Sequence, residues 1–153
     1  MNKLTVAVAL WMSVGFAWAG AGPACLFSPA ELSAALGHTP QEGVASQDRL
    51  GMPLCRYVGK DSPNRKFSVR IVNRCDQQLF DTHAKTMQSI SGKANKPLGG
   101  IGDGAYFSSG GTAAMRLGAQ CIELSGLRVG AKRVVTEADV GKLLSLAATR
   151  VGK

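Results

Sequence analysis

The stretch from Leu98 to Leu127 constrains the fold most, because its short apolar runs are separated by glycines. Such punctuation is typical of a tight antiparallel meander. The candidate strands are 105–108, 112–117 and 120–125, with turns at 109–111 and 118–119. The turn glycines can adopt the positive φ that short hairpin loops require. The sequence therefore predicts three consecutive antiparallel strands here.

The middle strand of this meander alternates between two kinds of side chain. One face carries Ala113, Met115 and Leu117, and the other carries Thr112, Ala114 and Arg116. This alternation predicts a sheet with one buried face and one solvent-exposed face. A two-residue turn at 118–119 would place Arg116 opposite Cys121 and diagonal to Glu123. We therefore expect an Arg116–Glu123 ion pair on the exposed face, which would stabilise the fold little.

The glycines that precede the meander resemble a nucleotide-binding loop. Gly100, Gly102 and Ala105 match the pattern G-x-G-x-x-A. That motif binds a pyrophosphate only where a helix begins directly after it. Here Tyr106, Phe107 and a Gly-Gly turn follow instead. We therefore interpret residues 99–104 as a glycine-rich turn.

The first 19 residues have the three parts of a secretory signal peptide. Lys3 supplies the charge, residues 4–16 form the apolar run, and Ala17-Trp18-Ala19 is a small-x-small cleavage site. The apolar run is shorter than the roughly 20 residues that span a bilayer. Cys25 leaves a lipoprotein as an alternative, but the preceding residues 22–24 lack the usual leucine. We expect a periplasmic or secreted protein with one domain over residues 20–153.

All four cysteines lie beyond the predicted signal peptide, at Cys25, Cys55, Cys75 and Cys121. Four cysteines in an exported domain favour two disulfides, for which three connectivities exist. We favour Cys25–Cys55 and Cys75–Cys121, because each would tie the start of a helix to a strand. Each should stabilise the fold by about 3–4 kcal/mol. The cysteines have no C-x-x-C spacing and both histidines stand apart from them, so neither a metal site nor a cofactor is expected.

The remaining segments predict three helices and three further strands. Helices are expected at 29–36, 76–90 and 137–151, with Ser28 and Thr136 as caps. Strands are expected at 41–47, 54–58 and 66–72. The fold class is therefore α+β, in α-βββ-α-βββ-α order. We expect an antiparallel sheet of about six strands with the helices packed on one face.

The helix predicted over 76–90 carries an apolar stripe and a histidine beside it. The stripe consists of Leu79, Phe80, Ala84, Met87 and Ile90. His83 flanks it, which favours a semi-buried structural role over catalysis. No G-x-S-x-G motif is present, a Cys-His nucleophile would need a free thiol, and no pair of carboxylates stands out. The sequence favours a protein that is not an enzyme.

Three segments together resemble a known kind of protein. They are 25–37 (CLFSPAELSAALG), Cys55-Arg56-Tyr57 and 100–106 (GIGDGAY). The chain is similar over these segments to small exported bacterial domains of unassigned function, which occur as secreted proteins, lipoproteins and sensor-like modules. The shared motifs are a capped helix, a cysteine pair and a glycine turn. The resemblance implies no catalytic residues.

The chain is basic, with a formal net charge of +8. Four cations could gather on the exposed face of two adjacent strands: Arg56, Lys66, Arg70 and Arg74. Such a patch would bind an anionic glycolipid, a membrane surface or an acidic envelope protein. The competing interpretation is a solvated basic face without a partner. Nucleic acid is not an expected partner, because an exported protein is separated from the usual nucleic-acid targets. In addition, only 6% of residues are aromatic, so few aromatic side chains stand among the basic ones.

These observations lead to three functional hypotheses. The first is a non-enzymatic binding module for an envelope protein or an anionic surface. The alternative is a small-ligand or sensor-type domain with a pocket between sheet and helices. The weakest is an envelope hydrolase or a hydrolase inhibitor. A flat apolar patch rimmed by arginine would favour the first, and a pocket with converging polar groups the second.

Overall fold

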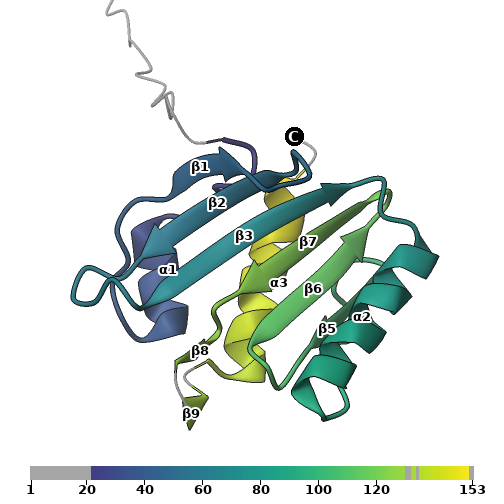
Figure 1. Ribbon diagram of the computed structural model, residues 1–153. Helices are drawn as coiled ribbons and strands as arrows, with labels where there is room; N and C mark the ends of the chain where they lie inside the picture. Colours follow the sequence, from purple (N-terminus) through teal and green to yellow (C-terminus); the bar gives the residue numbers. More distant parts are fainter. Residues whose placement is uncertain (1–21, 130–131, 134, 152–153) are drawn as a thin grey trace, which may run out of the picture.

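A computed structural model describes residues 22–129, 132–133 and 135–151 (Figure 1). The predicted signal peptide lies outside the described residues. The described chain has the α+β class expected, with helices and an antiparallel sheet. The helices are α1 (Pro29–Leu36), α2 (Gln77–Ser91) and α3 (Glu137–Arg150). The predicted caps Ser28 and Thr136 each accept a backbone N–H of the first turn, and Asp76, predicted as the first residue of its helix, caps α2 in the same way.

The described residues form one seven-stranded antiparallel sheet and a two-stranded ribbon. The sheet strands are β1 (Val44–Gln47), β2 (Pro53–Val58), β3 (Lys66–Asn73), β4 (Lys96–Pro97), β5 (Gly104–Phe107), β6 (Thr112–Leu117) and β7 (Gln120–Ser125). The ribbon pairs β8 (Arg128–Val129) with β9 (Lys132–Arg133). The spatial order is β1-β2-β3-β7-β6-β5-β4, so the two predicted strand groups join through β3 and β7. The prediction of six strands was wrong in one respect, because β4 pairs with β5 in a segment expected to be a loop.

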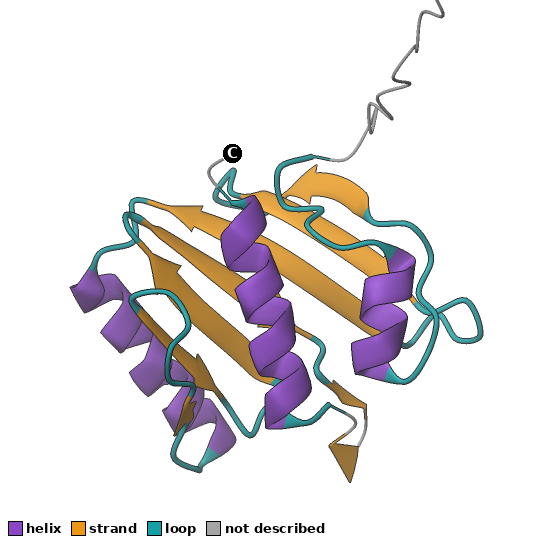
Figure 2. Cartoon of the chain, turned by 180° about the vertical axis from the view of Figure 1, so that it is seen from behind, coloured by secondary structure: helices purple, strands orange, loops and turns teal. Residues whose placement is uncertain are grey.

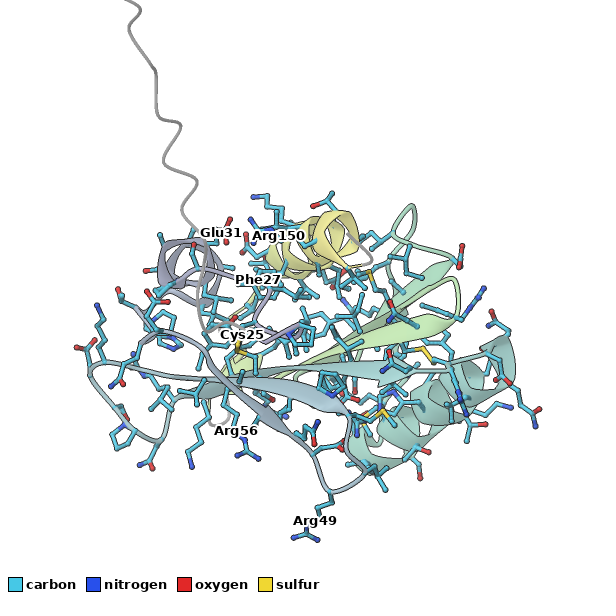
Figure 3. The ribbon with its side chains drawn as sticks, turned by 90° about the horizontal axis from the view of Figure 1, so that it is seen from above. Cys25, Phe27, Glu31, Arg49, Arg56 and Arg150 are labelled. Carbon is cyan, nitrogen blue, oxygen red and sulfur yellow. A yellow bond between two sulfur atoms is a disulfide. The ribbon has the colours of Figure 1, made fainter. Side chains whose placement is uncertain are left out.

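The first face of the sheet is covered by α1 and α3 (Figures 2 and 3). Its main core includes Leu32 and Leu36 of α1, Val140, Leu143, Leu144 and Ala147 of α3, and Val69, Met115, Ile122 and Leu124 of the sheet. Tyr57 lies in this layer and donates its hydroxyl hydrogen to the Phe27 carbonyl at 3.0 Å. The disulfide Cys25–Cys55 ties the segment before α1 to β2 on this side. This layer supplies most of the apolar burial.

The second face is covered in part by α2, which corrects the prediction that the helices share one face. Phe80 packs on Tyr106, Ala114 and the Cys75–Cys121 disulfide in a separate small core. The face of β6 expected to be exposed is therefore buried at Ala114, which is 1% exposed. Fewer residues of α2 pack on the sheet than the predicted apolar stripe contains, because Leu79 and Ile90 are 44% and 75% exposed.

The glycine-rich segment before β5 forms a turn, as its context predicts. Gly102 has φ 56°. A Cβ at this position would lie 2.4 Å from the Arg116 carbonyl oxygen. That distance excludes any side chain, so Gly102 is required for the close approach of this turn to β6.

Candidate functional site

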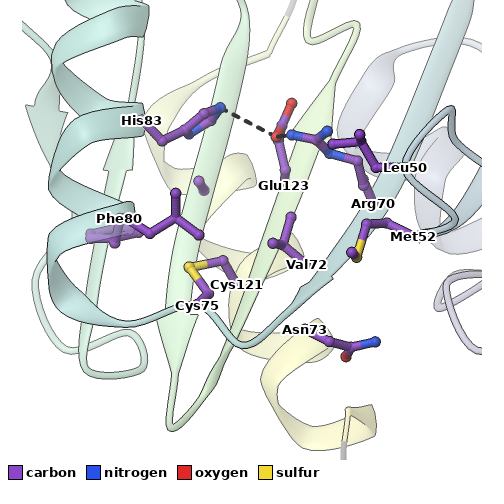
Figure 4. Close-up of a pocket in the computed structure, with 12 residues that line it drawn as sticks. Leu50, Met52, Arg70, Val72, Asn73, Cys75, Phe80, His83, Cys121 and Glu123 are labelled. Carbon is purple, nitrogen blue, oxygen red and sulfur yellow. Dashed lines mark hydrogen bonds and ion pairs between the residues drawn. A yellow bond between two sulfur atoms is a disulfide. The ribbon is translucent and has the colours of Figure 1, made fainter.

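A cavity of about 310 Å³ lies on the α2 side of the sheet, between α2 and the part of the sheet that α2 does not cover (Figure 4). One wall comes from α2 and the opposite wall from the loop between β1 and β2. The floor is formed by β3, β6, β7 and the Cys75–Cys121 disulfide. Its lining consists of Leu50, Met52, Arg70, Val72, Asn73, Cys75, Leu79, Phe80, His83, Ala114, Cys121 and Glu123. Most of these side chains are apolar, and the charged ones gather at one end.

Asp48 holds the β1–β2 loop in place over the sheet. Its Oδ1 accepts the backbone N–H groups of Leu50 and Met52 at 2.8 and 2.9 Å. Its Oδ2 forms an ion pair with Arg70 Nη1 at 3.2 Å. The Met52 backbone hydrogen bond, with those of Leu50 and Arg70, lowers the pKa of Asp48. The loop therefore presents Leu50 and Met52 to the cavity from a defined position.

A continuous chain of polar contacts crosses the charged end of the cavity. Arg70 Nη2 contacts Glu123 Oε2 at 2.6 Å, and His83 Nε2 contacts the same oxygen at 3.3 Å. His83 Nδ1 lies 2.5 Å from the Tyr106 hydroxyl. Figure 4 shows His83 and Arg70 meeting Glu123 from α2 and β3. Because these elements are far apart in sequence, this cluster exists only in the folded chain.

The protonation of the Tyr106 hydroxyl follows from its environment. Burial, with a smaller effect of the Glu123 charge, raises the pKa of Tyr106, so the phenol keeps its proton. The protonated hydroxyl can donate to His83 Nδ1, while His83 Nε2 faces Glu123. Burial lowers the pKa of Arg70, but the charges and hydrogen bonds of Glu123 and Asp48 outweigh this effect and raise it overall. The cluster thus consists of paired polar groups around a charged guanidinium.

The sequence predicted a different partner for Glu123, namely Arg116. The structure confirms that Arg116 lies opposite Cys121. Glu123, however, pairs with Arg70 of the neighbouring strand β3. Arg116 lies 3.4 Å from Asp103 instead. The diagonal Arg116–Glu123 pair was wrong because Arg70 stands directly across from Glu123 in the β3–β7 register.

The four cations predicted as a binding patch share one side of β2 and β3 only in part. Arg56 and Lys66 are exposed, and Arg56 lies opposite Ser68, two residues from Lys66. Arg70 is half-buried and held between two carboxylates. Arg74 follows the end of β3 with φ 59°, about 20 Å along the strand direction from Ser68. Arg56, Lys66 and Arg70 therefore lie on one face of β2 and β3, whereas Arg74 lies beyond the end of β3.

Arg49 is a cation near the cavity that the sequence reasoning missed. It is exposed and lies in the β1–β2 loop directly before Leu50. Figure 3 shows Arg49 and Arg56 projecting from the same side of the sheet as α2. Arg74 lies between two cavity-lining residues, Asn73 and Cys75. Two exposed arginines, Arg49 and Arg74, are thus adjacent in sequence to residues that line the cavity.

One sequence signal could have revealed the covered half of this face. Tyr106 and Phe107 are consecutive in β5, and both are buried. Consecutive residues of a strand point to opposite faces, so two large aromatic side chains in a row require cover on both. The cavity itself has no such signal, because its walls come from segments that the sequence does not link.

Among the described residues, no group of three histidine, cysteine or acidic side chains is arranged to hold a metal ion. Comparison with models of known families, with curated proteins and with solved structures finds no match for this chain. The interpretation of the site therefore depends on its own geometry and chemistry.

Proposed function

We propose that this protein is an exported, non-enzymatic module that binds an anionic, partly apolar ligand in the cavity beside α2. The observation that carries this proposal is a cavity of about 310 Å³ with apolar walls and Arg70 at one end. Small-ligand sites typically enclose about 300–1,000 Å³, with a few converging polar groups on an apolar lining. The cavity has these properties, and this favours the small-ligand hypothesis over a flat docking surface.

The polar cluster supports binding rather than catalysis. A general base must lie within hydrogen-bond reach of the proton that it abstracts, directly or through one water. Both ring nitrogens of His83 already contact protein groups, Tyr106 and Glu123. The nearby cysteines Cys75 and Cys121 are joined in a disulfide. The groups that could act as a base or nucleophile here are therefore engaged within the protein.

Export is the cellular part of this proposal. The two disulfides fit an oxidising compartment, and the described residues include no helix long and apolar enough to cross a membrane. The signal-peptide hypothesis for residues 1–19 predicts a periplasmic or secreted chain that starts at Gly20. Intact-mass analysis of exported material tests this. A diacylglyceryl group on Cys25 at the N-terminus would refute it.

The anionic fluorescent probe 8-anilinonaphthalene-1-sulfonate tests the binding site. We expect the native protein to bind it with saturation, and Leu79→Glu to weaken this binding at least tenfold. Leu79 is 44% exposed, so the charge should enter the cavity wall without unfolding the protein. Ile90→Glu is the matched control, because Ile90 lies on the same helix, is 75% exposed and does not line the cavity. Equal probe binding by both variants would refute the cavity as the site.

A second candidate function is docking onto an anionic envelope surface or protein. It is favoured by the half of the α2 side formed by β1–β3, where Arg56, Lys66 and Val44 are all exposed. Binding to phosphatidylglycerol vesicles should then weaken steeply between low salt and 0.1 M, where screening acts within about 10 Å. The double variant Arg56→Glu/Lys66→Glu should abolish it, with Lys85→Glu/Lys142→Glu as the control of equal charge change. Equal loss in both variants would indicate attraction by net charge alone and refute this docking face.

A further inference from the structure

We propose that the ligand of the cavity is a single-chain amphiphilic carboxylate, with its alkyl chain in the cavity and its carboxylate on Arg70. This inference rests on the proposed binding function and specifies the chemical class of the ligand. Three features of the structure carry it: the composition of the walls, the free donors of Arg70 and the charges at the edges.

The walls fit a flexible apolar chain. Leu50 and Met52 of the β1–β2 loop and Leu79 of α2 line the cavity walls, and Val72 of β3 lies in the floor with the disulfide. Leu50 and Leu79 are 77% and 44% exposed, so the side chains of both leucines are partly in water. An alkyl chain bound between Leu50 and Leu79 would remove apolar surface of both side chains from water. A volume of about 310 Å³ is at the small end for ligand sites, which favours one chain over a two-chain lipid.

The guanidinium of Arg70 has donors left for a ligand. It carries five N–H groups. One on Nη1 is given to Asp48 and one on Nη2 to Glu123. The Nε of Arg70 is buried and has no hydrogen-bond partner within the described part of the chain. The side chain is 31% exposed, so its remaining terminal N–H groups are accessible to a carboxylate, whose planar oxygens match a guanidinium.

The two carboxylates beside the cavity, Asp48 and Glu123, already accept hydrogen bonds from groups of the protein. Asp48 accepts from Leu50, Met52 and Arg70. Glu123 Oε2 contacts Arg70 and His83, and its Oε1 accepts from Ser125 at 3.3 Å. The exposed arginines Arg49 and Arg74 flank lining residues. A ligand anion therefore finds donors here, whereas a ligand cation would find acceptors that other groups occupy.

Decanoate, at concentrations below those at which it forms micelles, is the probe for this inference. Titration of the mature chain followed by amide NMR should shift the signals of Leu50, Met52, Val72 and Leu79, with saturation. Decanol and decyltrimethylammonium carry the same chain with a neutral and a cationic head. We expect decanol to bind at least tenfold more weakly than decanoate, and the cation to bind more weakly still.

Two variants separate the contribution of the chain from that of the head. Leu79→Glu should weaken both decanoate and decanol at least tenfold, whereas Ile90→Glu should change neither. Arg70→Lys keeps the charge but loses the planar fork, so it should weaken decanoate about tenfold and leave decanol unchanged. Decanol binding as tightly as decanoate, or decanoate binding equally to Arg70→Lys, would overturn the carboxylate assignment.

The outcome also distinguishes this inference from the function on which it rests. If the fluorescent anion binds in a manner that depends on Leu79 but decanoate does not displace it, the cavity binds ligands and the carboxylate inference is wrong. If decanoate shifts amides only outside the cavity, the inference is equally wrong. If neither probe binds at the cavity, both proposals fail.

Discussion

The two faces of the sheet are built differently. On the α1 and α3 side, one apolar core extends across the sheet, and its buried side chains include Leu32, Val69 and Leu144. On the α2 side, one helix covers part of the sheet, and the chain Arg70–Glu123–His83–Tyr106 crosses the edge of the covered area. Each side has one disulfide. The first face is arranged for burial, whereas the second retains charge and a cavity.

The comparison shows why the candidate site lies on the second face. The small core under α2 contains Phe80, Tyr106 and Ala114. This apolar contact surface is narrow, and α2 leaves β1–β3 uncovered on this side (Figure 1). The polar side chains at its edge pair with one another, and the apolar walls of the cavity lie beside them. A site forms where the packing of a layer stops, as ligand pockets often do at the junction of elements.

Removal of each disulfide should lower the free energy of unfolding more than the other changes below. It should also distinguish the two faces of the sheet by their effects on ligand binding. We expect Cys25→Ala/Cys55→Ala and Cys75→Ala/Cys121→Ala each to lower the free energy of unfolding by about 4 kcal/mol, since loop-closure entropy changes little between these loops. The sequence separations are 30 and 46 residues. Urea denaturation measures this loss.

Only the second of these pairs lines the cavity. Binding of the fluorescent anion should therefore be lost in Cys75→Ala/Cys121→Ala and kept in Cys25→Ala/Cys55→Ala, measured where each variant is still folded by circular dichroism. The reverse pattern would contradict the placement of the ligand site on the α2 side.

Leucine truncation should sharpen the contrast in packing between α3 and α2. Leu144 is 0% exposed, so Leu144→Ala should lower the free energy of unfolding by about 3 kcal/mol through lost burial and a cavity. Leu79→Ala should cost about 0.5 kcal/mol, because Leu79 is 44% exposed. Thermal and urea unfolding measure both values. Comparable losses would show that α2 packs as tightly as α3.

A smaller effect than that of Leu144→Ala is expected at the Glu31–Arg150 pair, which joins α1 to α3 on the first face. The Arg150 hydrogen bond holds the pKa of Glu31 at about 2, below its ordinary value of 4.5. The stabilisation is therefore present above pH 4.5 and is lost as the pH falls toward 2. Glu31→Gln should lower the free energy of unfolding by about 1 kcal/mol at pH 7, because the pair is partly exposed. The difference from the native protein should vanish near pH 2, and a constant difference would contradict the pair.

Local chemistry made much of the fold predictable from sequence. Ser28, Asp76 and Thr136 mark helix starts because each side chain satisfies a backbone N–H three residues away. Gly102 and its neighbours mark a turn through backbone sterics. The favoured cysteine pairing is the one in the structure, because each pair links a helix start to a strand. Strand positions in the meander followed from alternation and turn residues.

The tertiary structure alone decided which face of the sheet each helix covers, and with it the candidate site. The periodicity of α2 shows an apolar stripe but not the side on which the stripe packs. Glu123 could pair with Arg116 or Arg70 by residue type, and the β3–β7 register selected Arg70, 53 residues away. The sequence by itself determined the elements and their links, since these depend on neighbours along the chain. The cavity depends on which distant segments meet, and that is settled only when the whole sheet has formed.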